Sequence, residues 1–314
     1  MNQIKGGNVS QAEPALETPI YGGNAQILDS QTRDLLVESA PQMEVWSRIE
    51  CNSKPKGGME EWAKENRLQP ESCGWYHGTW QYLRLLDMVA VPHWHRQFYN
   101  RVLGSILREK PNANVLICAA ADWGMLASLH EAMQIAHAAP EIVVYDICKT
   151  PLKSCEWYAE RHNIRITTKC ANIITENIAE APFDLIVTDE FLTVLKAEYK
   201  PLIAKRWKEL LKNGGAVVTV AMMGGETTPD LRKGYAHRAR TLLELTGSSH
   251  ANGKTGQVIQ NCTNFANFHT RHMVSGEEEV RSLLSEFDRV ECCRITTPGE
   301  CVNPTDSFQI AAWK

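Results

Sequence analysis

Short apolar runs alternate with amphipathic segments through the middle of the chain. Between Asn114 and Asp146, an apolar run passes through a small-residue turn into a helical pattern, and a second apolar run ends in a lone acid. This order is typical of a β-α-β unit. Because consecutive units of this kind require a mostly parallel sheet with helices on both faces, we predict such a sheet. The predicted strands are 114–119, 141–147, 164–169, 183–188 and 215–222, and the predicted helices between them include 150–162 and 198–211.

The ends of the chain follow other patterns. Residues 1–25 mix Gly, Asn and Pro without a period, which predicts a mobile arm. Interrupted helical periodicity over 26–110 predicts an N-terminal helical cap, followed by an α/β core over 111–222. The alternation stops over 223–275, which we interpret as an insertion or lid, and residues 276–314 then complete the core sheet. This last part contains a predicted helix, 276–287, and two predicted strands, 289–296 and 306–313.

Composition narrows the classes of function. The chain has 314 residues and a net charge of −4, without the basic stripe that neutralises a phosphate backbone, so we expect no nucleic-acid partner. The N-terminus lacks an apolar signal core, and the ten cysteines are scattered, which indicates reduced thiols in a cytoplasmic protein. No apolar run approaches the length of a membrane span. The pairs His93/His95 and His269/His272 lack further ligands at metal spacing, so we expect no metal.

The turn after the first strand is suited to an adenosine-containing ligand. Small side chains at Ala119 and Ala121 let the backbone approach a ligand, and Asp146 can accept hydrogen bonds from two ribose hydroxyls. A dinucleotide needs glycines here for its pyrophosphate, whereas this turn has only Gly124 and carries Asp122, which repels phosphate. S-adenosylmethionine has cationic groups and no phosphate, so the turn favours it. A core β-α-β unit without a ligand remains an alternative.

The order of these pieces resembles the class I S-adenosylmethionine-dependent methyltransferases of the small-molecule type, over roughly 112–222 and 276–314. Tyr145-Asp146-Ile147 resembles the family's second motif, and Phe183 to Glu190 resembles the fourth, which faces the sulfonium and the acceptor. The first motif is similar but departs from the pattern, with Ala119, Ala121 and Trp123 at its glycine positions. Its residue order is closer to the turn of aminopropyl transferases. The resemblance implies a doubly wound, mostly parallel seven-stranded sheet with a reversed hairpin at its end.

Methyl transfer is an in-line displacement, to which a protein contributes alignment, desolvation and sometimes a base. Asp189 and Glu190 follow the fourth strand and are our candidate catalytic residues, with a solvated helix cap as the alternative. Ordinary packing is the alternative for the aromatic candidates, and a surface position is the alternative for Arg84. The candidate cofactor-binding residues are Ala119, Ala121, Asp122, Asp146, Ile147, Ala171, Asn172, Tyr76 and Arg84. The candidate substrate-binding residues are Trp80, His237, Phe265 and His269.

Four functions are compatible with these patterns. The leading hypothesis is methylation of a small-molecule acceptor, with 223–275 covering the site. Transfer or ring closure of the aminoalkyl chain, which releases methylthioadenosine, uses the same cofactor. A non-catalytic binding module comes third, and a nucleotide-binding oxidoreductase comes fourth. The aromatic patch of the insertion also suits a homodimer interface.

Overall fold

The computed structural model describes residues 28–51, 73–225, 229–246, 253–297 and 305–314, so the predicted arm 1–25 lies outside the described residues. The described residues form a seven-stranded sheet with the order β3-β2-β1-β4-β5-β7-β6, in which β7 runs opposite to the other strands. This confirms the predicted sheet and its reversed final hairpin. The strands are β1 (Asn114–Cys118), β2 (Glu141–Asp146), β3 (Ile166–Cys170), β4 (Phe183–Val187), β5 (Leu211–Met222), β6 (Arg289–Thr297) and β7 (Thr305–Trp313).

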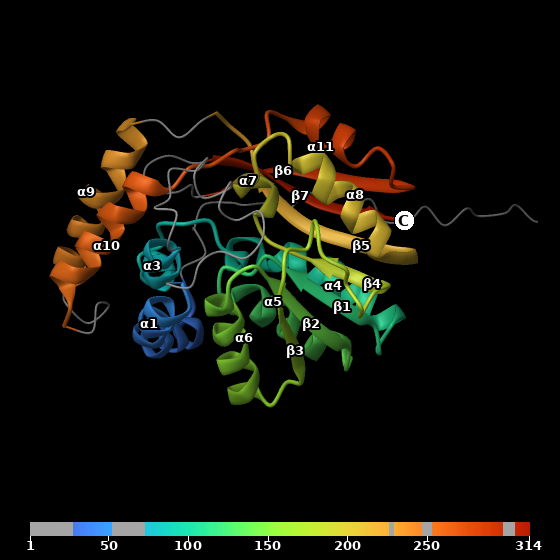
Figure 1. Ribbon diagram of the computed structural model, residues 1–314, viewed down its shortest axis with the longest axis horizontal. Coiled ribbons are helices and arrows are strands. Elements are labelled where there is room, and N and C mark those ends of the chain that lie inside the picture. Colours follow the sequence, from blue (N-terminus) through green and yellow to red (C-terminus); the bar gives the residue numbers. More distant parts are fainter. Residues whose placement is uncertain (1–27, 52–72, 226–228, 247–252, 298–304) are drawn as a thin grey trace, which may run out of the picture.

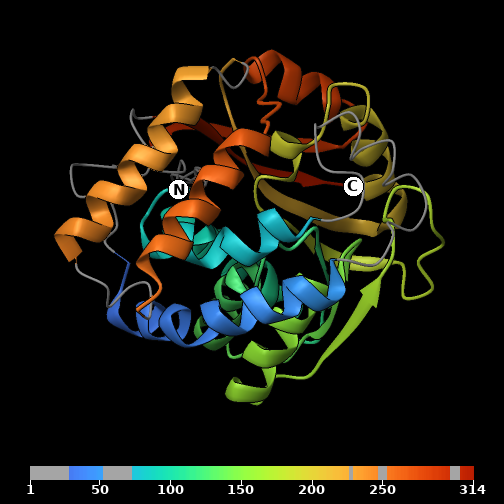
Figure 2. The same ribbon diagram turned by 60° about the vertical axis from the view of Figure 1, so that its left-hand side comes forward.

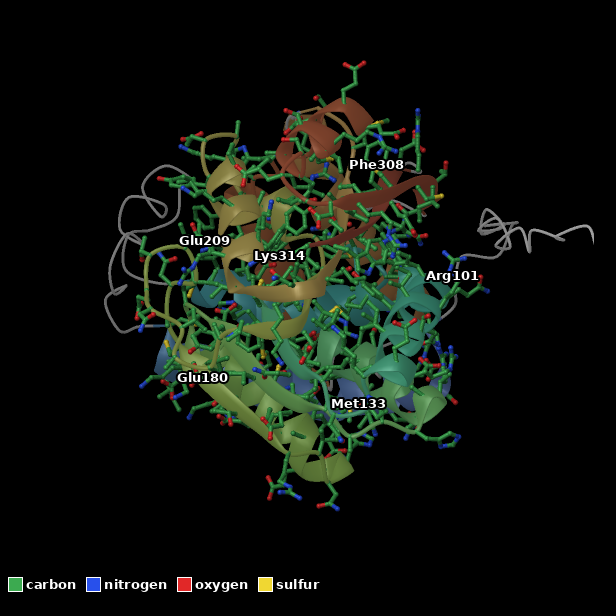
Figure 3. All side chains as sticks on the ribbon, turned by 90° about the vertical axis from the view of Figure 1, so that its right-hand side faces the viewer. Arg101, Met133, Glu180, Glu209, Phe308 and Lys314 are labelled. Carbon is green, nitrogen blue, oxygen red and sulfur yellow. The ribbon has the colours of Figure 1, made fainter. Side chains whose placement is uncertain are left out.

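Helices cover both faces of the sheet. One buried cluster joins α4, α5 and α6 to the sheet, and a second joins α8 and α11 to the opposite face. Figure 3 views the end of the sheet near Lys314, with Glu209 of α8 on one side and Arg101 of α4 and Met133 of α5 on the other. The central strands β1 and β4 are almost entirely buried because helices lie on both sides of them. The helices are α4 (Arg96–Glu109), α5 (Gly124–Ala136), α6 (Lys149–His162), α7 (Phe191–Val194), α8 (Lys200–Leu210) and α11 (Glu277–Leu283).

Four further helices stand together at one end of the sheet, on the left in Figure 1. They are α1 (Ser30–Glu50), α3 (Gly74–Leu85), α9 (Pro229–Thr246) and α10 (Thr255–Phe268). These helices contact one another in series: α1 packs against α6 of the core, α3 against α1, α10 against α3 and α9 against α10, as Figure 2 also shows. The C-terminal residue Lys314 is hydrogen-bonded to Gly214 and Gly215 at the start of β5, which marks the amino ends of the parallel strands. In Figure 1 this terminus lies at the opposite end of the sheet from the four helices. The helices therefore lie at the carboxyl ends of the parallel strands.

Two predicted boundaries were wrong. The turn predicted at Asn213–Gly215 lies inside β5, because Lys314 accepts a hydrogen bond from the Gly214 N–H at 2.5 Å and donates one to the Gly215 carbonyl at 2.9 Å. Residues 213–215 have a sequence that is typical of a turn, but hydrogen bonds to the C-terminal residue hold them in a strand. The helix predicted over 276–287 ends earlier, at Leu283.

The start of α1 and the segment before α4 show how local sequence determines these elements. Asp29 is the N-cap of α1, where its carboxylate accepts the Thr32 N–H at 2.8 Å. Pro92 begins the 3₁₀ helix η1 (Pro92–His95), which leads directly into α4. Within the described residues, no helix is both long and apolar enough to cross a membrane.

Candidate functional site

A cavity of about 400 Å³ opens at the carboxyl ends of β1 to β4. The strand order reverses between β1 and β4, and ligands of open α/β sheets bind in the crevice at such a reversal. The lining comes from the turns after these four strands, from α3 and from the segment that follows α10. The sequence thus brings together, in one place, motifs that are separated along the chain.

The turn after β1 is held in an uncommon conformation. Ala119 has φ of 57°, a left-handed value that costs free energy for residues other than glycine. Its N–H donates to the Tyr145 carbonyl at 3.0 Å, which fixes the turn against β2. Ala119, Ala120 and Ala121 all line the cavity. Because their side chains are single methyl groups, a ligand can approach the backbone of this turn closely.

Asp122 lines the cavity but does not offer it an unbalanced charge. One carboxylate oxygen accepts the Gly124 N–H at 2.8 Å, and the other is paired with the Arg84 guanidinium. Both side chains are buried, and the guanidinium carbon of Arg84 lies 4.5 Å above the centre of the Trp123 ring. A Cβ at position 124 would lie 3.0 Å from an Asp122 oxygen and 3.2 Å from Arg84, which explains why this helix begins with glycine.

The position of Arg84 differs from both interpretations made from the sequence. Its side chain is buried, which excludes a surface arginine, and it is not among the residues that line the cavity. The guanidinium neutralises Asp122 from behind the turn.

Asp146 ends β2 and faces the cavity. One of its carboxylate oxygens accepts the Cys148 N–H at 2.7 Å, which orients the side chain. Burial raises the pKa of Asp146 above its usual range. Ile147 also lines the cavity and is partly exposed.

The turn after β3 forms the next part of the wall. Its Ala171 N–H donates to the Asp146 carbonyl at 2.9 Å. The side-chain oxygen of Asn172 accepts the Ile174 N–H at 3.0 Å, so this amide orders the turn in which it sits. Both Ala171 and Asn172 line the cavity.

Asp189 follows β4 and has the features of a proton-transfer group. Its carboxylate accepts a hydrogen bond from the Tyr99 hydroxyl at 2.5 Å. Burial raises the pKa of Asp189 to about 7, although the Tyr99 hydrogen bond and the charge of Arg84 act in the opposite direction. A carboxylate that titrates near neutrality can both take and return a proton at physiological pH.

Glu190 has a different role in the structure. It is the N-cap residue of α7 in a left-handed conformation, with φ of 55°. Its carboxylate accepts the Met222 N–H at 2.9 Å and a hydrogen bond from the Thr193 hydroxyl. These bonds tie α7 to β5, so the carboxylate of Glu190 orders the cavity wall that it lines.

Aromatic side chains close the cavity on the side of α3 and α10. Tyr76 stacks on Trp80 with ring centres 5.0 Å apart, and His269 stacks on Phe265 at 4.6 Å. Phe265 is fully buried behind this wall, and Trp75 contacts its ring at 5.7 Å. The segment Phe268 to Arg271 lines the cavity directly.

The cavity therefore collects most, but not all, of the candidate residues. Arg84, Phe265 and His237 are not among its lining residues, and His237 is exposed on α9. The candidates that do line it are Tyr76, Trp80, Ala119, Ala121, Asp122, Asp146, Ile147, Ala171, Asn172, Asp189, Glu190 and His269. Four further residues of the site were not predicted from the sequence, because only the fold brings them there: Tyr99, Cys148, Thr193 and Arg271.

No protein-family model and no curated protein matches the sequence. Among solved structures, the chain is similar to the N-methyltransferase NodS from Bradyrhizobium japonicum WM9 in complex with S-adenosyl-L-homocysteine, at 14% identity over 82% of this chain and 97% of that chain, with a TM-score of 0.43. It is also similar to a putative O-methyltransferase from Nostoc punctiforme PCC 73102, at 12% identity over 89% of this chain and 69% of that chain, with a TM-score of 0.46. A third similar structure is a S-adenosylmethionine-dependent methyltransferase from Methanosarcina mazei, at 18% identity over 65% and 93% of the two chains, with a TM-score of 0.44.

Proposed function

We propose that this protein transfers a methyl group from S-adenosylmethionine to a small-molecule acceptor. The observation that carries the proposal is the meeting, in one cavity, of an acid at the end of β2, a small-residue turn after β1 and a second acid after β4. The first two features suit the nucleoside and amino-acid parts of the cofactor, and the third suits chemistry at the acceptor.

Asp146 is the residue that we assign to the ribose. Its Oδ1 already accepts the Cys148 N–H, which leaves the remaining acceptor capacity of the carboxylate for the ribose hydroxyls. The adenine then lies toward Ala171 and Asn172, and the methionine part lies over the turn after β1. This arrangement requires no phosphate group.

The start of α5 favours S-adenosylmethionine over a dinucleotide. A pyrophosphate binds to the unsatisfied N–H groups at a helix N-terminus. Here the Gly124 N–H is already bonded to the Asp122 carboxylate, and that carboxylate lies in the cavity wall. A pyrophosphate would have to displace the Asp122 carboxylate from the Gly124 N–H, whereas S-adenosylmethionine has no phosphate and needs no donor at this position.

Asp189 is the residue that we assign to the acceptor. An acceptor that is a protonated amine or a hydroxyl must lose a proton for methyl transfer, and a carboxylate that titrates near pH 7 can take this proton. Tyr99 holds the carboxylate in place. Glu190 keeps α7 against β5 and so contributes to the shape of the pocket.

The aromatic wall supplies desolvation and affinity for a cation. Tyr76 and Trp80 line the cavity, and an aromatic ring whose face meets a sulfonium attracts it by cation–π interaction. The segment Phe268 to Arg271 completes the acceptor side of the cavity. Because His269 and Arg271 are among this lining, we favour a polar or anionic small molecule over a lipid as the acceptor.

Identification of the nucleoside product tests this proposal. We would incubate the full chain with S-adenosylmethionine carrying a deuterated methyl group and a metabolite extract as the pool of acceptors, and analyse the mixture by mass spectrometry. The expected products are S-adenosylhomocysteine and a small molecule that carries the label, both lost in Asp189→Asn. Release of methylthioadenosine would instead identify aminoalkyl transfer. Binding of a nicotinamide dinucleotide without binding of S-adenosylmethionine would refute both.

A further inference from the structure

Four metal-ligating side chains meet beside the cavity, and the proposed methyl transfer does not use them. Cys51 follows α1, Cys73 and His77 lie at the start of α3, and Cys148 precedes α6. Their ligand atoms all lie within 4.8 Å of one another. Three elements that are far apart in the sequence thus contribute to one compact group.

The distances match those of a tetrahedral metal site. The Cys51 sulfur lies 3.6 Å from the Cys148 sulfur and 3.5 Å from Nδ1 of His77, and the Cys73 and Cys148 sulfurs are 3.7 Å apart. Zinc–sulfur bonds of about 2.3 Å in tetrahedral geometry place two sulfur atoms about 3.8 Å apart. Ligand atoms from three separate elements therefore meet at the spacing that one zinc ion requires.

We propose that Cys51, Cys73, His77 and Cys148 bind a zinc ion as a structural site with three thiolates and one imidazole. Thiolate and imidazole ligands favour zinc over magnesium or calcium, which prefer oxygen. Four protein ligands complete the tetrahedron and leave no open position for a metal-bound water, which distinguishes a structural site from a catalytic one. This replaces the expectation from the sequence that the chain binds no metal.

Neighbouring groups support the ligands. The Thr150 hydroxyl lies 3.1 Å from the Cys51 sulfur, and the Thr150 N–H donates to the Cys148 sulfur at 3.5 Å. Hydrogen bonds of this kind orient the thiolates of a metal site and disperse their charge. Cys73 and His77 are spaced four residues apart, which places them on one face at the start of α3.

The position of the site gives it a structural purpose. It joins α1 and α3 of the helical cap to the turn between β2 and α6, which belongs to the core. The Cys148 N–H also donates to Asp146 at 2.7 Å, so the metal fixes the loop that orients this acid. The zinc site is independent of the identity of the cofactor, although its loss would loosen the proposed ribose site.

Metal content tests the proposal directly. The untagged full chain, purified under reducing conditions, should contain about one zinc per chain by plasma mass spectrometry, and a mercurial thiol reagent should release it to a colorimetric indicator. Cys51→Ser and Cys148→Ser should each retain well under half of this zinc. Cys293→Ser is the matched control, because Cys293 lies on β6, outside the group, and should retain it all.

Cobalt substitution keeps the proposal testable if the cysteine variants fail to fold. The wild-type chain loaded with cobalt(II) should show the intense visible bands of tetrahedral thiolate coordination, which octahedral cobalt lacks. A folded chain that binds neither zinc nor cobalt in stoichiometric amount would overturn the proposal. So would a disulfide between Cys148 and either Cys51 or Cys73 in peptides mapped without reduction, because it would identify a redox pair instead.

Discussion

Replacement of Arg84 by methionine should destabilise the protein strongly, because it leaves Asp122 buried without its cation. The two side chains are 2% and 3% exposed. After the substitution, the Asp122 carboxylate would keep the Gly124 N–H at 2.8 Å, but no neighbouring positive charge would balance it. Removal of one partner from a buried ion pair typically costs about 3–5 kcal/mol. Methionine retains most of the apolar stem of arginine, although it also removes the guanidinium that lies 4.5 Å above the Trp123 ring.

Urea unfolding followed by tryptophan fluorescence measures this loss. Arg48→Met is the control, because the Arg48 side chain is 63% exposed and lies 3.5 Å from the Glu44 carboxylate. Loss of this exposed ion pair should lower the free energy of unfolding by less than about 1 kcal/mol. The double variant Arg84→Met/Asp122→Asn should be more stable than Arg84→Met alone, since it leaves no buried charge. If Arg84→Met lowers the free energy of unfolding no more than Arg48→Met does, the pair does not have the role inferred here.

Three further predictions concern the cavity. If Asp189 is the base, kcat/KM should rise with pH up to about 7 and then level off, because its pKa is raised to about 7 and only the carboxylate accepts a proton. Tyr99→Phe should shift this rise to higher pH, since the Tyr99 hydrogen bond lowers the Asp189 pKa, and an unmoved profile would exclude Asp189 as the titrating group. Gly124→Ala should lower the free energy of unfolding by about 1–3 kcal/mol in urea titrations, because the new Cβ lies 3.0 Å from a buried oxygen; a neutral result would contradict the tight packing. His269→Ala should raise the KM for the acceptor while His237→Ala leaves it unchanged, because only His269 lines the cavity; equal effects would argue against acceptor contacts from the insertion.

The sheet and the acids at its edge could be predicted from the sequence because the signals for both are local. Apolar runs such as Val115 to Cys118 predict buried parallel strands, and the residue after such a run lies at the carboxyl edge. Asp146 and Asp189 were found in this way, and both line the cavity. The seven strands and the reversed final hairpin were expected from the resemblance to the methyltransferase family, and the sheet has both.

Pairing between distant residues could not be predicted, because nothing in the local sequence encodes it. Arg84 and Asp122 are 38 positions apart, and because they form an ion pair, the acid in the turn offers the cavity no unbalanced charge. Tyr99 is 90 positions from Asp189. The group around Cys148 has no signal in the spacing of the histidines for the same reason, since its four side chains come from three separate elements.

Calorimetric titration of S-adenosylmethionine into the wild-type protein and Asp146→Ala tests the proposed cofactor site most directly. The wild-type protein should bind one equivalent, and Asp146→Ala should weaken binding by about 1–3 kcal/mol through the lost charged hydrogen bonds. Asp34→Ala, at an exposed position of α1, should bind as tightly as the wild type. Absence of binding to the folded wild-type protein, or an unchanged Kd in folded Asp146→Ala, would contradict the assignment of this cavity to S-adenosylmethionine.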